Sequence, residues 1–513
     1  MIAVMCDVHH GDCLAVLRTL PDESVDSIVT DPPYGLSNTG PDKVADTIVR
    51  WAGGDREHVP EGRGFMGRPW DAFVPPPAVW DECLRVLKPG GHMLVFAGSR
   101  TQDLMGMSIR LAGFELRDSL AWIYGSGFPK SMDVSKAIDK DNGRKFEDRF
   151  ALGRHIRERR EALGHTRAEV NSWLGAATKA EHYESDSPGF ARVPTLADWR
   201  ILRERLDLSD EHLPLVERVE AEREVVGVRT TGIGTGKGGT AIIGDSANRN
   251  ITAPATPEAE RWAGWGTALK PAHEPILLAR KPLAGTVAGN VLEWGTGALN
   301  IDASRVATDD VLGRVNNDRA ADSASSYLIS GGRGGVLDSS DKRGGRWPAN
   351  VLLDEHAAEA MDQQSGHLPG GGFPGARNSD KFGTTYGEFQ GRTELVARKM
   401  DAGGASRFFH VFKYQAKAPK RERPVIERED GTKVAHPTVK PLALMEWLVT
   451  LVTPPGGTVL DPFAGSGTTL QAARDKGFRS IGIEADADHV ALIRERLEQG
   501  SGEPDLFTCG SDG

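Results

Sequence analysis

The stretch Asp461-Pro-Phe-Ala-Gly-Ser-Gly-Thr-Thr469 decides the fold expected of this chain. The apolar run Thr458–Leu460 before it predicts a strand, and residues 468–476 predict a helix that begins within it. Its glycines let the backbone approach a ligand closely, and the start of a helix favours an anionic group. The next predicted strand, Ser480–Glu484, ends in the carboxylate with which a nucleotide-binding α/β unit accepts ribose hydroxyls. The stretch therefore predicts an α/β fold with a nucleotide site.

A second signal lies near the start of the chain. The apolar run Val25–Thr30 predicts a strand, and Asp31-Pro32-Pro33-Tyr34 ends it because the prolines cannot continue a strand. Asp31 and the carbonyl of Pro32 are placed to accept hydrogen bonds from one amino group, and Tyr34 offers a ring for a planar base. The alternative is a proline-rich turn with a capping aspartate.

Composition predicts a globular protein of more than one domain. At 513 residues the chain is too long for a single core, and its contents of 39% hydrophobic and 26% charged residues are ordinary. The four cysteines show no CxxC spacing, and no apolar stretch approaches the length needed to span a bilayer. We therefore expect a cytoplasmic protein without a metal site, a disulfide framework or contact with a membrane.

Two segments between the motifs differ from their surroundings. Residues 150–216 are rich in Arg, Glu and Leu and predict an all-helical insert. Its expected helices are Leu152–Leu163, one capped by Thr166 with Glu169, Thr178–Ser185, and one opened by Thr195 with Asp198. Residues 230–391 are dominated by glycine and predict long loops with a few ordered islands.

Basic and aromatic residues alternate in a third segment, residues 389–428. The segment holds ten Lys or Arg against four acidic residues, although the whole chain has a net charge of −10. Phe408, Phe409, Phe412 and Tyr414 are interleaved with the basic residues. This composition suits a surface that meets phosphates and bases, and the alternative is a solvated loop with a small aromatic core.

Together these motifs resemble those of the beta-class DNA amino-methyltransferases. Asp31–Tyr34 is similar to the catalytic motif of that family, and Asp461–Thr469 is similar to its S-adenosylmethionine motif. His436-Pro-Thr-Val-Lys-Pro441 resembles the motif that flanks the methionine portion of the cofactor, and Gly11-Asp12-Cys13 resembles the loop at its adenine. The catalytic motif precedes the cofactor motif, which is typical of the beta class.

The resemblance implies a Rossmann-like S-adenosylmethionine-dependent methyltransferase fold. Its sheet would be mostly parallel and seven-stranded, in circularly permuted motif order, with the helical insert and a glycine-rich recognition region added. The expected divisions are a catalytic half (1–149), the insert (150–216), a return to the core (217–284), target recognition (285–431), a cofactor half (432–500) and a tail (501–513).

The implied activity is methyl transfer to adenine N6 in double-stranded DNA after base flipping. Cytosine N4 is the alternative target, because cytosine-N4 members more often carry Ser at the position of Asp31. An enzyme acting on protein or RNA, and a non-catalytic DNA-binding regulator with a degenerate methyltransferase body, are further alternatives. With no nuclease, helicase or Walker motif, we expect a methyltransferase that acts alone or beside a separate restriction enzyme.

The resemblance assigns roles residue by residue. The expected catalytic residues are Asp31, Pro32, Pro33 and Tyr34. The expected cofactor-binding residues are Asp12, Cys13, Thr438, Lys440, Asp461, Phe463, Ala464, Gly465, Gly467, Thr468 and Glu484. The expected DNA-binding residues are Arg407, Lys413, Lys417 and Lys420, with Arg154 and Arg157 in the insert.

The insert itself resembles a lambda-repressor-type helix-turn-helix module. It departs from that pattern at residues 185–193, which contain two prolines and predict an irregular stretch. The resemblance implies a second contact with DNA, made to phosphates by arginines of its first helix. The alternative is a helical bundle used for packing or for pairing with a second copy of the chain.

Overall fold

The chain divides into two compact units, and each is described by itself. The computed structural model describes all residues except 1–4, 38, 63, 65–70, 126, 128–130, 141–143, 188–189, 222–224, 236–240, 253, 255–256, 309–344, 368–401, 413–423, 429, 437 and 500–513. The first unit comprises Met1–Gly127 with Ala272–Gly513, and the second comprises Phe128–Pro271. The second unit is thus wider than the insert expected at 150–216, and the core resumes at Ala272 and not at residue 217.

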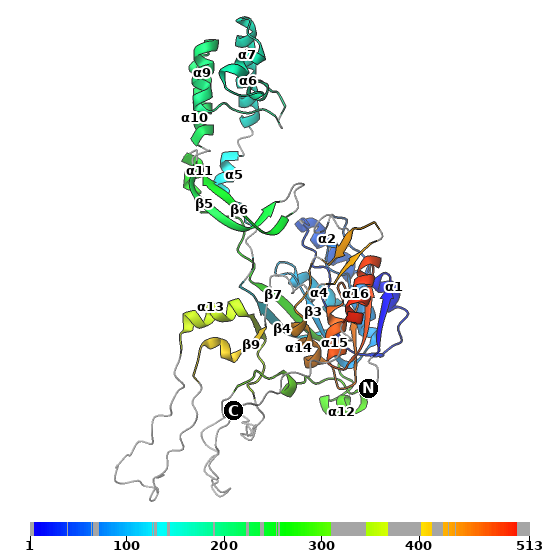
Figure 1. Ribbon diagram of the computed structural model, residues 1–513. Coiled ribbons are helices and arrows are strands. Elements are labelled where there is room, and N and C mark those ends of the chain that lie inside the picture. Colours follow the sequence, from blue (N-terminus) through cyan, green and yellow to red (C-terminus); the bar gives the residue numbers. More distant parts are fainter. Residues whose placement is uncertain are drawn as a thin grey trace, which may run out of the picture. The chain divides into compact units, whose positions relative to one another are not determined.

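The first unit is built on one sheet in the order β1-β13-β12-β2-β3-β7-β4-β8-β9 (Figure 1). The strands are β1 (Cys6–His10), β2 (Val25–Thr30), β3 (Leu87–Phe96), β4 (Glu115–Ile123), β7 (His273–Arg280), β8 (Val351–Asp354), β9 (His410–Phe412), β12 (Thr458–Asp461) and β13 (Arg479–Glu484). Neighbouring strands are parallel, except that β7 runs antiparallel to both β3 and β4.

The sheet is mostly parallel, as predicted, but it has nine strands and not the seven expected. The two additional strands, β8 and β9, continue the sheet beyond β4. Both come from the expected recognition region, 285–431. Pairing with an edge strand satisfies their backbone groups, and this is a tertiary effect that local sequence does not reveal.

Helices pack against the sheet through two hydrophobic cores. The described helices of this unit are α1 (Cys13–Leu17), α2 (Pro41–Ala52), α3 (Pro77–Val86), α4 (Gln102–Leu111), α12 (Val287–Trp294), α13 (Glu355–Ser365), α14 (Leu442–Val452), α15 (Thr468–Asp475) and α16 (Ala487–Gln499). Successive residues of β3 alternate between the cores: Met93 packs in one with α3 and α4, and Leu94 packs in the other with α14. Since side chains alternate across a strand, the sheet is buried on both faces.

The second unit contains a helical bundle with its own core. Its bundle helices are α6 (Arg144–Ala162), α7 (Arg167–Trp173), α8 (Lys179–Tyr183), α9 (Leu196–Leu206) and α10 (Leu213–Ala221). The core residues of the bundle lie between Leu152 and Val219. The predicted capping box is present, since the Thr166 hydroxyl accepts from the Glu169 amide and Glu169 accepts from the Thr166 amide.

The glycine-rich residues 230–391 contain more regular structure than the sequence predicted. β5 (Val225–Thr235) and β6 (Ala241–Thr252) form an antiparallel ribbon in the second unit, which also contains α5 (Val134–Lys140) and α11 (Pro257–Arg261).

A second small ribbon, β10 (Val425–Glu427) with β11 (Lys433–Ala435), belongs to the first unit. Within the described part of the chain, no helix is long and apolar enough to cross a membrane.

Candidate active site

The two motifs meet at the point in the sheet where the order of the strands along the chain reverses. β12 lies beside β2, with Leu460 opposite Ile28. From β12 the chain passes through α15 to β13 on one side, and from β2 it passes through α3 to β3 on the other. Ligands of open α/β sheets bind beyond the carboxyl ends of the strands at such a switch point. Asp461 and Asp31 both stand at this edge.

A buried hydrogen bond joins the two strand ends. The Thr30 hydroxyl donates to Asp461 Oδ1 over 2.7 Å, and the Phe463 amide donates to the same oxygen over 3.1 Å. Burial raises the pKa of Asp461 to about 6, although hydrogen bonds from Thr469, Thr30 and Phe463 lower it. The bond fixes Asp31, the residue after Thr30, next to the loop that follows Asp461.

That loop closes onto Glu484. Gly465 has a φ of +52°, and its amide donates to Glu484 Oε2 over 2.8 Å. The other oxygen, Oε1, accepts from the Asp486 amide over 2.9 Å. A Cβ added at Gly465 would lie 3.1 Å from His436 Nε2, so only glycine fits this space without displacing His436.

These residues fit S-adenosylmethionine, the cofactor expected from the sequence. Each Glu484 oxygen accepts one backbone N–H and keeps a lone pair, so the carboxylate retains capacity for vicinal ribose hydroxyls. The missing side chain at Gly465 leaves a cradle beside that carboxylate. Gly11 belongs to the same neighbourhood, because its amide donates to the Glu484 carbonyl over 3.0 Å.

Asp31 is held by its own motif. The Tyr34 hydroxyl donates to Asp31 Oδ1 over 2.7 Å, and the Thr101 hydroxyl donates to the Tyr34 carbonyl over 2.6 Å. Burial, followed by the charge of Asp31, raises the pKa of Tyr34 well above its ordinary value. Pro32 is buried and Pro33 is half-buried. The motif is therefore a rigid turn that presents one oriented carboxylate.

Lys440 lies at Asp31. Its ammonium is 2.8 Å from Asp31 Oδ2 and 3.5 Å from Glu274 Oε2. The sequence had placed Lys440 with the cofactor, and it had not singled out Glu274 at all. Glu274 stands next to the predicted ordered run Pro275–Ala279, so an acidic residue beside an apolar run was its available signal.

Of the other expected cofactor residues, three lie in the glycine loop and four have contacts or burial of their own. Phe463, Ala464 and Gly467 lie in the loop between Asp461 and α15, as predicted. Asp12 caps α1 through the Ala15 amide, and burial raises the pKa of the Cys13 thiol to about 12. Thr468 is buried and accepts from Arg496 over 2.7 Å. The carbonyl of exposed Thr438 contacts His436 Nδ1 at 2.5 Å.

The expected DNA-binding segment is only partly described. Lys413, Lys417, Lys420 and Tyr414 lie outside the described residues. The Arg407 guanidinium donates to the carbonyls of Gly403 and Gly404 and stacks on Phe408. Phe412 is a core residue that packs against Trp122 and Trp447, so at this position the alternative of an aromatic core applies, and not a DNA-facing aromatic.

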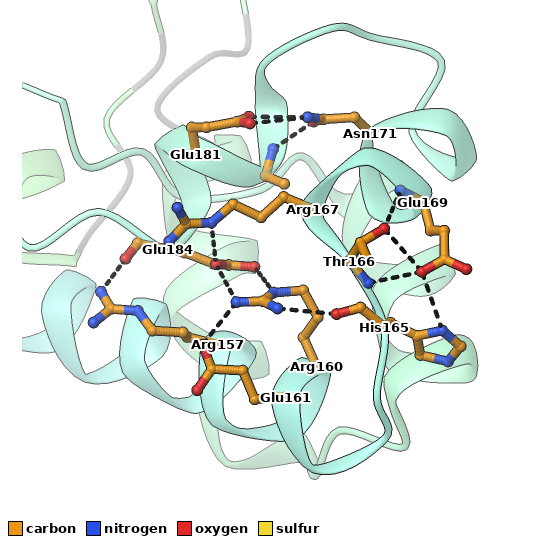
Figure 2. Close-up of polar contacts among 11 residues, drawn as sticks. Arg157, Arg160, Glu161, His165, Thr166, Arg167, Glu169, Asn171, Glu181 and Glu184 are labelled. Carbon is orange, nitrogen blue, oxygen red and sulfur yellow. Dashed lines mark hydrogen bonds and ion pairs between the residues drawn. The ribbon is translucent and has the colours of Figure 1, made fainter.

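The arginines of α6 are mostly engaged within their own bundle (Figure 2). Arg160 is buried, and its guanidinium lies 2.7 Å from the carboxylate of Glu184, which Arg167 also contacts. Arg157 donates to the Glu184 carbonyl and pairs with Asp186 at 2.9 Å. The expectation that Arg157 is a DNA contact is therefore not supported, because its charge is neutralised internally. Arg154, in contrast, is exposed.

Residues 241–495, just under half of the chain, match the N6/N4 DNA methylase family. The matched residues include the glycine loop and Glu484 but not Asp31. The family is S-adenosylmethionine-dependent, which agrees with the cofactor expected from the sequence.

Curated relatives match over shorter segments. The chain is 46% identical over 63 residues to Type II methyltransferase M2.DpnII of Streptococcus pneumoniae, which is 12% of this chain and 24% of the relative. It is 40% identical over 72 residues to Type II methyltransferase M.ScaI of Streptomyces caespitosus, which is 14% of this chain and 24% of the relative. The chain thus spans about a quarter of the length of these relatives.

Solved structures show a slight likeness. The M1.HpyAVI-SAM complex matches with a TM-score of 0.32 and 12% identity over 96% of this chain and 99% of that one. PvuII DNA methyltransferase (cytosine-N4-specific) matches with a TM-score of 0.35 and 12% identity over 96% and 87%. TM-scores this low carry no argument about the fold or the activity.

Proposed function

We propose that the chain is a site-specific DNA methyltransferase that transfers a methyl group from S-adenosylmethionine to adenine N6 in double-stranded DNA. The observation that carries the proposal is the hydrogen bond from Thr30 to Asp461. It sets the Asp31 motif directly beside the glycine loop, so a base-amino acceptor and a nucleotide cradle share one edge of the sheet. The family match over residues 241–495 supports the same class of activity.

The proposed mechanism rests on positioning. Asp31 and the Pro32 carbonyl accept the hydrogens of an exocyclic amino group, which turns the nitrogen lone pair toward the methyl donor. Bound S-adenosylmethionine supplies a methyl group already activated by its sulfonium charge. Since the target amino group cannot be reached inside the duplex, the base must be flipped out, and the ring of Tyr34 offers a surface for it. Orientation of this kind accounts for a large part of a rate acceleration.

Glu484 and the loop around Gly465 are proposed to hold the cofactor. Glu484 would accept the ribose hydroxyls, and the backbone at Gly465 would lie against the ligand. Gly11, Asp12 and Cys13 follow β1, which pairs with β13 so that His10 lies opposite Glu484, and the Gly11 amide donates to the Glu484 carbonyl. None of these residues supplies acid or base chemistry in the proposal, because their role is to bind and orient.

Adenine is preferred to cytosine because Asp31 stands where cytosine-N4 members of the resembling family more often carry Ser. In the helical bundle, Lys179 of α8 pairs with Asp198 and exposed Glu181 of α8 is acidic, whereas exposed Arg154 is the proposed phosphate contact. The described contacts of α8 therefore favour packing over reading of base edges.

Base-resolved sequencing of DNA from cells that express the chain tests the proposal. We expect N6-methyladenine at one sequence, its loss in Asp31→Ala, and its retention in the control Asp46→Ala, whose carboxylate pairs with Arg50 on the surface of α2. Detection of N4-methylcytosine instead would show that the target is cytosine N4, the alternative, and not adenine N6. S-adenosylmethionine binding without any methylated base would contradict the enzymatic proposal and favour a non-catalytic regulator.

A further inference from the structure

One buried ammonium is surrounded by three oxygen acceptors from separate parts of the first unit. Lys440 Nζ lies 2.8 Å from Asp31 Oδ2, 3.1 Å from the Tyr34 hydroxyl oxygen and 3.5 Å from Glu274 Oε2. Asp31 and Tyr34 follow β2, Glu274 belongs to β7, and Lys440 precedes α14. An ammonium has three N–H donors, so this cluster matches its full capacity.

The ammonium of Lys440 lies between the carboxylates of Asp31 and Glu274. Burial lowers the pKa of Lys440, but the nearby carboxylates of Asp31 and Glu274 outweigh it and raise that pKa above its ordinary value. Lys440 is therefore a permanent cation, with a side chain only 14% exposed. It also lies over the rings of Phe96 and Tyr34, at 4.8 Å and 5.5 Å from their centroids.

The cluster determines which lone pairs of Asp31 remain for a ligand. Oδ1 accepts from the Tyr34 hydroxyl and Oδ2 contacts Lys440, so each oxygen retains a lone pair in a fixed direction. These fixed directions suit an acceptor that orients an amino group. Glu274 completes the arrangement, because without it one side of the ammonium has no acceptor in the cluster.

We propose that Glu274 and Lys440 form a positioning pair that aims the Asp31 carboxylate at the amino group of the target base. This inference rests on the proposed function and deepens it. It moves Lys440 from the cofactor to the target base, and it gives Glu274 a role that acts through Lys440 and not by contact with the base.

The test compares Glu274→Gln with the matched control Glu446→Gln. Glu446 on α14 pairs with Lys476 at 2.9 Å, and its side chain is 25% exposed against 27% for Glu274. Misplacement by about 1 Å lowers rates on the order of 100-fold, so we expect Glu274→Gln to lower kcat by tenfold or more. The Kd for S-adenosylmethionine, measured by calorimetry, should change less than twofold, and Glu446→Gln should leave both quantities unchanged.

Substitution of the lysine separates charge from packing. Lys440→Met should lower kcat further, because it removes the ammonium that contacts Asp31 Oδ2 and the Tyr34 hydroxyl oxygen. Lys440→Arg keeps a cation at this position and should restore part of kcat. Calorimetry should show a nearly unchanged Kd for S-adenosylmethionine in both variants, so that the loss falls on kcat and not on cofactor binding.

The outcomes distinguish this inference from the proposed function. If the wild-type chain methylates DNA and Glu274→Gln retains its kcat, the positioning pair is refuted while the methyltransferase stands. If both lysine variants lose cofactor affinity, Lys440 belongs to the cofactor as the sequence first indicated. If the wild-type chain methylates no base, the proposed function fails, and the positioning pair that rests on it fails with it.

Discussion

Thr30 and Asp461 are distant in sequence, and a 2.7 Å hydrogen bond joins their side chains in the centre of the sheet. Both are buried, and each ends the strand that carries one of the two motifs. Because neither motif can shift without breaking this bond, it couples the geometry of the Asp31 turn to that of the glycine loop.

Thr30→Val should therefore lower methylation activity by more than its loss of stability accounts for. The isosteric change removes one donor from a buried carboxylate, at a cost of about 1–3 kcal/mol in the free energy of unfolding. Thr453→Val is the control, because it removes an equally buried bond, 2.8 Å long, to Ser27. Chemical denaturation should show comparable losses, while methylation assays should show a deficit confined to Thr30→Val. Equal activity in both variants would contradict the coupling.

The raised pKa of Asp461 predicts a pH-dependent stability contribution. A carboxyl whose pKa is about 6 when folded binds its proton more tightly in the folded state than in the unfolded state. Its contribution to stability is thus present at low pH and is lost as pH rises from about 4 to about 6. The difference amounts to about 3 kcal/mol at most.

Asp461→Asn removes this titration. The variant should therefore become more stable relative to wild type as pH rises. The difference in the free energy of unfolding, variant minus wild type, should be larger at pH 8 than at pH 4. Urea denaturation at both pH values measures this difference. A difference that stays constant between the two pH values would contradict the raised pKa of Asp461.

Gly465→Ala should weaken cofactor binding through shape. The added carbon meets His436 in the cradle beside Glu484, and a left-handed φ also costs about 1–2 kcal/mol for an L residue. Gly477→Ala carries the backbone cost alone, since its φ is +79° and no atom lies within 4 Å of the added carbon. Calorimetry should show a Kd for S-adenosylmethionine raised about tenfold, or about 1.4 kcal/mol, only in Gly465→Ala. Equal affinities in the two variants would remove this loop from the binding site.

Local patterns predicted the motif-bearing elements well. β2 has the predicted bounds, Val25–Thr30, because its buried apolar run is complete within the segment. Thr195 also caps its helix as expected, through the Asp198 amide. Turn and cap chemistry is local, so sequence reveals it.

Long-range pairing was the part that sequence did not reveal. β8 and β9 owe their place to an edge strand far away in the chain, and Lys440 contacts Asp31 because of how the β2 and α14 segments pack. Glu274 joins them from β7. Such contacts depend on the register between distant segments, which no local periodicity encodes.

Arg154 is exposed, whereas the guanidinium of Arg157 is engaged within the bundle, so the two residues should differ in their contribution to DNA binding. If the bundle touches phosphates, Arg154→Ala should reduce DNA affinity and lower the slope of log K against log salt by about 0.9. Arg157→Ala should leave that slope unchanged, because its guanidinium is engaged with Glu184 and Asp186. Fluorescence titration across salt concentrations measures both. An unchanged slope in Arg154→Ala would favour packing or self-association as the role of the bundle.

Removal of the helical bundle tests the division of labour between the two units. The bundle has its own hydrophobic core, whose buried members all lie between Leu152 and Val219. Deleting residues 144–221 and joining the ends by a flexible Gly/Ser linker should therefore leave the core of the first unit intact. We expect the shortened chain to fold, to bind S-adenosylmethionine with unchanged affinity and to methylate the same sequence. DNA affinity should fall and its salt dependence should become shallower if basic residues of the bundle, Arg154 among them, contact phosphates. Sequencing of modified DNA decides the main point, because a change in the methylated sequence would make the bundle a specificity element.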